Sequence, residues 1–158
     1  MNVLIVDDDK LARKGLIAIM DWEKYGFKVA GDVQNGRKAL EFLRTHPVDI
    51  AFTDIDMPEI DGLELMQMCK EELPDIKFVI FSVYENFSYA QTAIRMGALD
   101  YISKISFSPE ECEQILERVS AKYRQTSRDG QADGEDREKL RELSRRWMYT
   151  GWIFNEKE

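Results

Sequence analysis

Short apolar runs alternate with amphipathic segments along most of the chain, and this alternation limits the possible fold more than any other feature of the sequence. Each run is short enough for one strand, and each intervening segment has apolar residues at helical spacing. Strands that alternate with helices form a parallel sheet with helices on both faces. The sequence therefore predicts a doubly wound α/β domain with five helices and five strands, at residues 3–6, 27–31, 50–52, 78–81 and 99–102.

Signals for helix ends lie where this fold requires them. Asn35 can cap the second helix, Pro74 can stop the third, and Gly97 suits the left-handed end of the fourth. Ser108 is followed by a proline and then a glutamate, as in a capping box for the fifth helix. After the first acids, apolar residues recur at helical spacing and predict the first helix, namely Leu11, Ala12, Gly15, Leu16, Ile19 and Met20.

The chain divides into a globular part and a tail. Residues 1–124 hold the five repeats, and residues 125–136 are polar with two glycines, which is typical of a linker. Residues 137–158 have apolar positions at helical spacing and aromatic residues that one short helix cannot bury. We interpret them as a C-terminal helical extension that begins a truncated second domain or serves as a dimerisation element. A tail that folds back on the first domain is the alternative.

Charge and composition exclude several classes of function. The formal net charge of −8 has the wrong sign for binding nucleic acid phosphates. The sequence has no basic leader and no apolar stretch of membrane-spanning length, so we expect a cytoplasmic protein without a membrane partner. The two cysteines fall at apolar positions of expected helices, which favours buried thiols over a disulfide. A single histidine leaves no metal site of the His/Cys kind.

Two acids directly follow the third apolar run. Asp54 and Asp56 come where the strand should end, before Pro58, Asp61 and Gly62 turn the chain. Ligands of open α/β sheets bind beyond the carboxyl ends of the strands, which makes Asp54 a functional candidate. A strand terminus without a function is the alternative for Asp54 considered alone.

Other polar residues are expected at the same edge of the sheet. In the flavodoxin-like strand order 2-1-3-4-5, the first and third strands are neighbours, so Asp7 and Asp8 would face Asp54. Carboxylates this close repel one another and need a cation, and oxygen ligands at an open site suit Mg²⁺. Ser82 and Lys104 follow the fourth and fifth strands and add a hydroxyl and a positive charge. This set predicts a site at which Asp54 attacks a phosphoryl group.

From residue 1 to about residue 123, the sequence resembles the response regulator receiver domain of two-component signalling. The resemblance rests on Val6-Asp7-Asp8, on Asp54-Ile55-Asp56-Met57-Pro58 with Asp61-Gly62, on Ser82, and on Asp100-Tyr101 with Lys104. It implies that the chain is a signalling switch rather than a turnover enzyme. Asp54 would accept a phosphoryl group from the phosphohistidine of a sensor histidine kinase.

The same resemblance implies roles for the surrounding residues. Ser82 and Lys104 would contact the phosphoryl group, and Tyr101 would turn inward. That movement would alter the face of the fourth helix, fifth strand and fifth helix, which is the usual homodimerisation surface. The implied Mg²⁺ ligands are Asp7, Asp8, Asp54 and the backbone carbonyl of Asp56.

A less specific resemblance concerns the wider protein. Residues 84–90 and the tail from residue 135 are similar to the subgroup whose receivers precede AraC-type DNA-binding domains. No helix-turn-helix occurs in this sequence. Transcriptional control and DNA binding would therefore belong to a longer protein.

Two positions depart from the family pattern. Lys104 is ordinarily followed by a cis proline, but Ile105 stands there, and a cis bond without proline costs about 2.5–4 kcal/mol. We therefore predict a trans bond and a shifted loop after it. The residue after Ser82 is usually small, whereas the β-branched Val83 would crowd the phosphoryl group and slow both its gain and its loss. The Asp56 side chain either modulates dephosphorylation or is a solvated loop acid.

Three other functions fit the sequence less well. A haloacid-dehalogenase-type phosphatase would use Asp54 as nucleophile and Asp56 as acid/base, but those enzymes carry this motif near the start of the domain. They also need acids late in the chain, where Lys104 stands. A receiver fold that takes no phosphate would serve only as an interaction module, yet all the expected polar residues are present. A flavin carrier would need Ser, Thr and Gly where this chain has acids after its first strand.

Overall fold

A computed structural model describes residues 1–83, 87–104 and 108–129. Its sheet has the strand order β2-β1-β3-β4-β5, and every neighbouring pair of strands is parallel. This confirms the predicted fold and strand order. The strands are β1 (Asn2–Val6), β2 (Lys28–Val33), β3 (Ile50–Thr53), β4 (Lys77–Ser82) and β5 (Asp100–Ser103).

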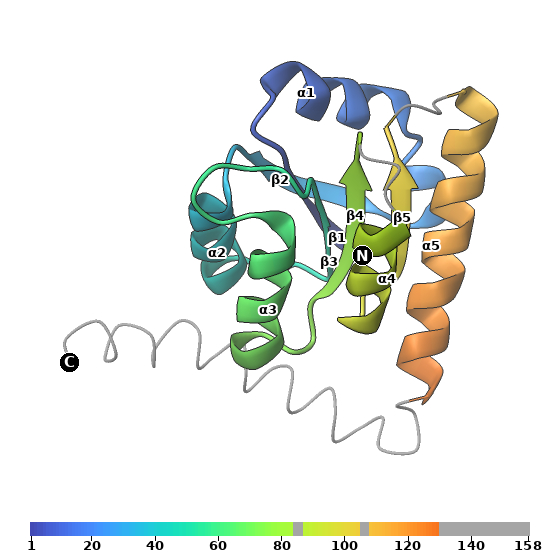
Figure 1. The fold of residues 1–158 in the computed structure, drawn as a ribbon. Helices are drawn as coiled ribbons and strands as arrows, with labels where there is room; N and C mark the ends of the chain where they lie inside the picture. Colours follow the sequence, from blue (N-terminus) through green and yellow to red (C-terminus); the bar gives the residue numbers. More distant parts are fainter. Residues whose placement is uncertain (84–86, 105–107, 130–158) are drawn as a thin grey trace.

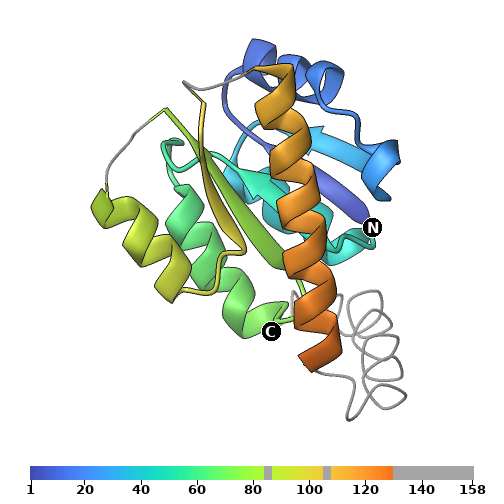
Figure 2. The same ribbon diagram turned by 90° about the vertical axis from the view of Figure 1, so that its right-hand side faces the viewer.

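Helices connect the strands and cover both faces of the sheet (Figures 1 and 2). A short 3-10 helix (Glu23–Tyr25) precedes β2. The α-helices are α1 (Lys10–Ile19), α2 (Gly36–Thr45), α3 (Gly62–Glu72), α4 (Phe87–Arg95) and α5 (Pro109–Asp129).

The sheet separates two apolar clusters. On one face, Leu4 and Ile80 of the strands pack with residues of α2, α3 and α4. On the other face, Ile5 and Phe52 pack with residues of α1 and α5. Alternate residues of β1 thus enter opposite cores, which is why this strand is apolar throughout rather than alternating with polar residues.

The helix-capping predictions are confirmed. Asn35 accepts a hydrogen bond from the Lys38 N–H at 2.8 Å, and Ser108 Oγ accepts one from the Glu111 N–H at 3.2 Å. Gly97 has a φ of 98°, the left-handed conformation expected after α4.

Both cysteines are buried free thiols, as predicted. No helix among the described residues is long and apolar enough to span a bilayer.

The structure differs from the sequence pattern in three places. On α1, Leu11 and Ile19 of the apolar pattern are 82% and 45% exposed, whereas Arg13 of the same helix is buried. On α4, the spacing of Ala90, Ala93 and Ile94 predicts a buried stripe, which is wrong for Ile94, because it is 51% exposed, although Ala93 is fully buried. Helix α5 continues to Asp129, past residue 125, where the linker was predicted to begin. The remaining linker and the extension at residues 137–158 lie outside the described residues.

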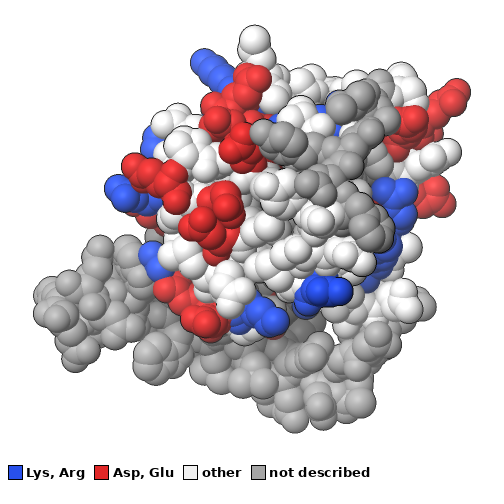
Figure 3. Space-filling model, in the orientation of Figure 1, with Lys and Arg blue, Asp and Glu red and all other residues white. Residues whose placement is uncertain are grey.

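The register between β1 and β3 positions the site. Val6 lies opposite Thr53 in the last pair of these two strands. The next residue along each strand is an aspartate, and the Asp54 N–H donates to the Val6 carbonyl at 2.9 Å. Asp7 and Asp54 therefore leave the sheet side by side at its carboxyl edge. In Figure 3, acidic side chains lie on several parts of the face shown, including its upper end, to which β4 and β5 point in Figure 1.

Candidate functional site

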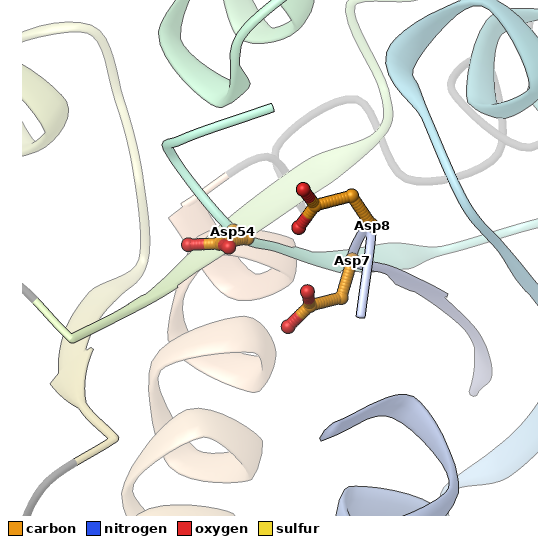
Figure 4. Close-up of side chains that lie close together, drawn as sticks. All are labelled: Asp7, Asp8 and Asp54. Atoms are coloured by element: carbon orange, nitrogen blue, oxygen red, sulfur yellow. The ribbon is translucent and has the colours of Figure 1, made fainter. Parts of the chain in front are cut away.

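Three carboxylates meet at the carboxyl edge of the sheet (Figure 4). Asp7 and Asp8 follow β1, Asp54 follows β3, and one oxygen of each lies within 4.8 Å of the others. Asp7 and Asp54 are 5% and 7% exposed, whereas Asp8 is open to solvent. The predicted acidic cluster is therefore present, with two buried acids and one accessible acid.

Lys104 brings a positive charge to this cluster. Lys104 follows β5. Its backbone N–H donates to the Ser82 carbonyl at 2.8 Å, which joins the end of β5 to the end of β4. Its Nζ pairs with Asp7 Oδ2 and lies 3.2 Å from Asp54 Oδ2. All three side chains of this ion-pair group are at most 14% exposed. Because solvent screens buried charges poorly, Lys104 holds both acids firmly.

The backbone around Asp54 is fixed by close packing. Asp54 Oδ1 accepts the Ile55 N–H at 2.8 Å, and the Asp54 carbonyl accepts the Thr53 hydroxyl at 2.9 Å. Gly62 begins α3 beside this segment, and its N–H donates to the Ile55 carbonyl at 2.9 Å. A Cβ at Gly62 would lie 2.2 Å from the Asp54 carbonyl oxygen. Only glycine lets α3 approach the end of β3 this closely.

Burial and mutual repulsion disfavour the charged forms of the acids. Burial raises the pKa of Asp54, Lys104 opposes part of that rise, and Asp7 adds to it. Asp8 is exposed, but its carboxylate loses part of its hydration beside the other acids, which raises its pKa, with a further contribution from its hydrogen bond to Asp7. Burial lowers the pKa of Lys104, but its hydrogen bond to Asp7 and the charge of Asp54 outweigh burial and raise it overall. The lysine is therefore charged at neutral pH.

The cluster fits a hard divalent cation. Among the described residues, three carboxylates converge with the ammonium group of Lys104, so negative charge is in excess. The donors are all oxygens, and the exposed Asp8 leaves the site open on one side, as suits Mg²⁺ with part of its water shell. Asp7, Asp8 and Asp54 could hold such an ion. The Asp56 side chain is exposed and is not among these three converging acids.

An Asp8→Asn variant tests the repulsion within the cluster. In metal-free buffer at pH 7, we expect its free energy of unfolding to exceed that of the wild type by about 1 kcal/mol, because one repelling charge is removed at a screened position. The raised pKa means that charged Asp8 disfavours the folded state above that pKa, so the difference should close as the pH falls through it. Urea unfolding with a chelator at pH 7 and pH 4 measures both values.

An Asp75→Asn variant is the control for this measurement, because Asp75 is exposed in the α3–β4 loop, far along the chain from the cluster. It should change stability little at either pH. A less stable Asp8→Asn protein at pH 7 would show that Asp8 is not repelled in the folded state.

The other predicted residues lie around the cluster. Ser82 ends β4 and is fully buried, and Tyr101 lies on β5 with a side-chain hydrogen bond to Ser82. Burial raises the pKa of the Tyr101 phenol, and the bond to Ser82 opposes part of that rise. Val83 is 51% exposed. The Lys104–Ile105 bond and the loop after it lie outside the described residues, as do residues 84–86 of the run 84–90.

Sequence reasoning missed one residue that contacts the backbone of the acidic cluster. Arg13 is 8% exposed, and its Nη1 donates to the main-chain carbonyl of Asp7 at 2.6 Å. An arginine within an amphipathic helix normally indicates the solvent face, so its position in the pattern gave no sign of this contact. The signal that could have revealed it is Asp32, an acid near the end of the neighbouring strand β2.

Comparison with known proteins agrees with this geometry. The sequence model of the response regulator receiver domain matches residues 3–118. The receiver domain of AraT from Geobacillus stearothermophilus is 36% identical, with a TM-score of 0.71 over 79% of this chain and 96% of that one. A two-component regulator AraC from Clostridium phytofermentans is 29% identical, with a TM-score of 0.66 over 82% of this chain and 98% of that one.

Curated relatives include longer proteins. Response regulator UvrY of Escherichia coli is 32% identical over 82% of this chain and 58% of its own length. The transcriptional regulatory protein YesN of Bacillus subtilis, whose function is uncharacterised, is 33% identical over 65% of this chain and 28% of its own. The chain thus spans between about a quarter and three fifths of these relatives. The family match over residues 3–118 shows that the chain belongs to the response regulator receiver domains of two-component signalling, and the geometry of the site agrees with this.

Proposed function

We propose that this chain is a phosphorylation-dependent switch with Asp54 as the phosphoacceptor. A carboxylate oxygen of Asp54 attacks the phosphorus of a phosphohistidine on a sensor histidine kinase. An O–P bond forms, the P–N bond breaks, and the histidine leaves with the electron pair of that bond. The observation that carries this proposal is the convergence of Asp54, two further acids and Lys104 at one edge of the sheet.

The protein groups have separate tasks in this transfer. Lys104 Nζ, which pairs with both buried acids, turns to the phosphoryl oxygens and offsets their negative charge. Ser82 is positioned at the end of the adjacent strand to donate its hydroxyl to the same oxygens. Burial keeps competing water away from Asp54 during the transfer.

Asp7, Asp8, Asp54 and the backbone carbonyl of Asp56 would hold Mg²⁺. When bound, the ion supplies charge neutralisation for the phosphoryl oxygens and orients them for in-line attack. Asp7 and Asp8 would fix its position from the end of β1, and Asp54 would contribute from the end of β3. The exposure of Asp8 provides the entry side.

The response to phosphorylation would pass through Tyr101. Its hydroxyl shares a hydrogen bond with Ser82, so movement of Ser82 toward a phosphoryl group removes that partner. Tyr101 lies on β5 between α4 and α5, and α4 exposes Tyr89 and Ile94. This face would form a homodimer in the phosphorylated protein. DNA binding and transcriptional control, through an AraC-type domain, would belong to a longer protein that contains this domain.

Mass spectrometry tests the proposed reaction. The protein is incubated with Mg²⁺ and a small phosphodonor, and the expected result is one added phosphoryl mass that chelation of the metal prevents. No added mass would instead support a receiver fold that serves only as an interaction module. Steady turnover of a phosphate ester would support a phosphatase.

A Val83→Ala variant tests the expected crowding beside Ser82. Both the gain and the loss of the phosphoryl group should become faster, because alanine removes the β-branch next to the site. Val83 is half exposed, so the substitution should leave the free energy of unfolding within about 0.5 kcal/mol of the wild type. Phosphorylation and decay are followed by mass spectrometry over time. If neither rate changes, Val83 does not limit access.

A further inference from the structure

Arg13 connects the acidic cluster to β2, the strand that pairs with β1 on the side away from β3. It lies on α1, is 8% exposed, and makes two directed contacts. Its Nη1 donates to the Asp7 main-chain carbonyl at 2.6 Å, and its Nε donates to Asp32 Oδ2 at 2.9 Å. Asp32 lies on β2 opposite Ile5 of β1. The guanidinium therefore bridges β2 and the first residue beyond β1.

Burial of this arginine requires compensation. Removing a guanidinium from water is costly unless its charge is paired and its N–H groups have acceptors. Asp32 provides the charge and also accepts Lys14 Nζ at 3.2 Å. Burial raises the pKa of Asp32, but the hydrogen bonds from Arg13 and Lys14 outweigh it and lower the pKa overall. Asp32 is thus charged at neutral pH and holds Arg13 in place.

The contact with Asp7 determines the orientation of one particular peptide. The Asp7 carbonyl belongs to the peptide that joins Asp7 to Asp8, the two acids of the cluster that follow β1. The Asp7 N–H donates to the Val33 carbonyl at 3.1 Å, and Asp7 Oδ1 accepts the Asp9 N–H at 2.9 Å. The carbonyl itself is held by Arg13. Rotation of this peptide would change the direction in which the exposed Asp8 side chain leaves the backbone.

We propose that Arg13 is a positioning residue that orients the Asp7–Asp8 peptide so that both carboxylates converge with Asp54 on a divalent cation. The inference rests on the proposed Mg²⁺ site. Arg13 touches neither the ion nor the phosphoryl group; it acts through the Asp7 carbonyl, and Asp32 acts through Arg13.

An effect of Arg13 through its charge alone would change Mg²⁺ affinity in the opposite direction from an effect through positioning. Arg13 is a cation near a cation site, so an Arg13→Gln substitution that acted only through charge would strengthen Mg²⁺ binding. Loss of positioning would weaken it. An Arg13→Lys substitution keeps the charge but lacks the planar fork that reaches two acceptors at once. Both variants should therefore bind Mg²⁺ more weakly, and the Gln variant separates the two explanations by sign.

Calorimetric titration of the full chain with Mg²⁺ measures this effect. We expect both Arg13 variants to bind Mg²⁺ about 10-fold more weakly, as is usual when a partner of a metal ligand is lost. Urea unfolding of the same samples gives the folded fraction, to which the affinities refer. Asp32→Asn should weaken binding in the same direction, and its effect should not add fully to that of Arg13→Gln because both act through one contact.

Arg44→Gln is the matched control. Arg44 is also paired with an acid, at 2.8 Å and 2.6 Å from the two oxygens of Glu72, but this pair joins α2 to α3. Its loss should lower stability without changing Mg²⁺ affinity. Phosphorylation of the Arg13 variants should approach the wild-type rate at saturating Mg²⁺, because the metal deficit is then removed.

The outcomes separate the inference from the function on which it rests. If the wild type binds Mg²⁺ and Asp8→Asn impairs it, but both Arg13 variants bind with unchanged or higher affinity, Arg13 only staples α1 to β2 and the inference is overturned. A wild-type protein that binds no Mg²⁺ overturns the proposed metal site together with the inference. Weaker binding by both Arg13 variants, with Arg44→Gln unchanged, supports it.

Discussion

An Asp54→Asn variant is expected to gain no phosphoryl mass under conditions in which the wild type gains one. Asparagine has nearly the same size and retains the backbone contacts of Asp54, but an amide is not a nucleophile toward phosphorus. The variant should remain folded, because burial already disfavours the charged form of Asp54. Intact-protein mass spectrometry after incubation with Mg²⁺ and a phosphodonor measures the result, and urea unfolding confirms the fold.

The control for this experiment is an exposed acid outside the cluster. Asp75→Asn alters charge by the same amount in the α3–β4 loop and should accept the phosphoryl group like the wild type. A phosphoryl mass that persists in Asp54→Asn would place the acceptor elsewhere, and Asp7 and Asp8 would be the next residues to replace.

A Gly62→Ala variant is expected to be strongly destabilised. The added Cβ would lie 2.2 Å from the Asp54 carbonyl oxygen and 3.0 Å from Ile55 Cα, and both are backbone atoms that cannot swing aside. Overpacking of this kind costs about 1–3 kcal/mol, and backbone contact places this position at the upper end. Relief of the clash must move α3 away from β3, which would also displace the Asp54 carboxylate. Phosphorylation of the folded fraction should therefore slow as well.

Gly15→Ala is the matched comparison, because the same substitution at this position is expected to raise the stability of the protein rather than lower it. Gly15 is exposed in the interior of α1, and a Cβ there would meet nothing within 4 Å. Alanine should stabilise that helix by about 0.5–1 kcal/mol. Urea unfolding of both variants compares the two glycines directly. Equal stability of Gly62→Ala and the wild type would mean that α3 can shift without cost.

The sequence was most informative where residues follow strands. Asp7 and Asp54 could be predicted as neighbours because strand order alone brings the carboxyl ends of β1 and β3 together. The same rule brought Lys104 to this edge from β5. It could not predict that Lys104 would pair with both buried acids, because that depends on side-chain reach across β3 and β4 and not on strand order.

The apolar pattern of α1 was misleading for a physical reason. Periodicity identified the helix, but Leu11 of the apolar pattern is exposed, and Arg13, a charged residue between the apolar positions, is buried. The structure reverses these two positions because Asp32 and the Asp7 carbonyl offer partners for a buried guanidinium. Such compensation comes from a neighbouring strand, so a pattern that considers one helix at a time does not contain it.

The pairing of Lys104 with Asp7 has a consequence for biosynthesis. These residues are separated by 97 positions, so a growing chain has synthesised β1 to β5 before the contact can form. Contacts this distant in sequence form only when the chain between them is organised. A ribosome-bound or truncated fragment that ends before β5 contains Asp54 but lacks its ammonium partner. Such a fragment would therefore lack the buried ion-pair group that Lys104 forms with Asp7 and Asp54 at the edge of the sheet.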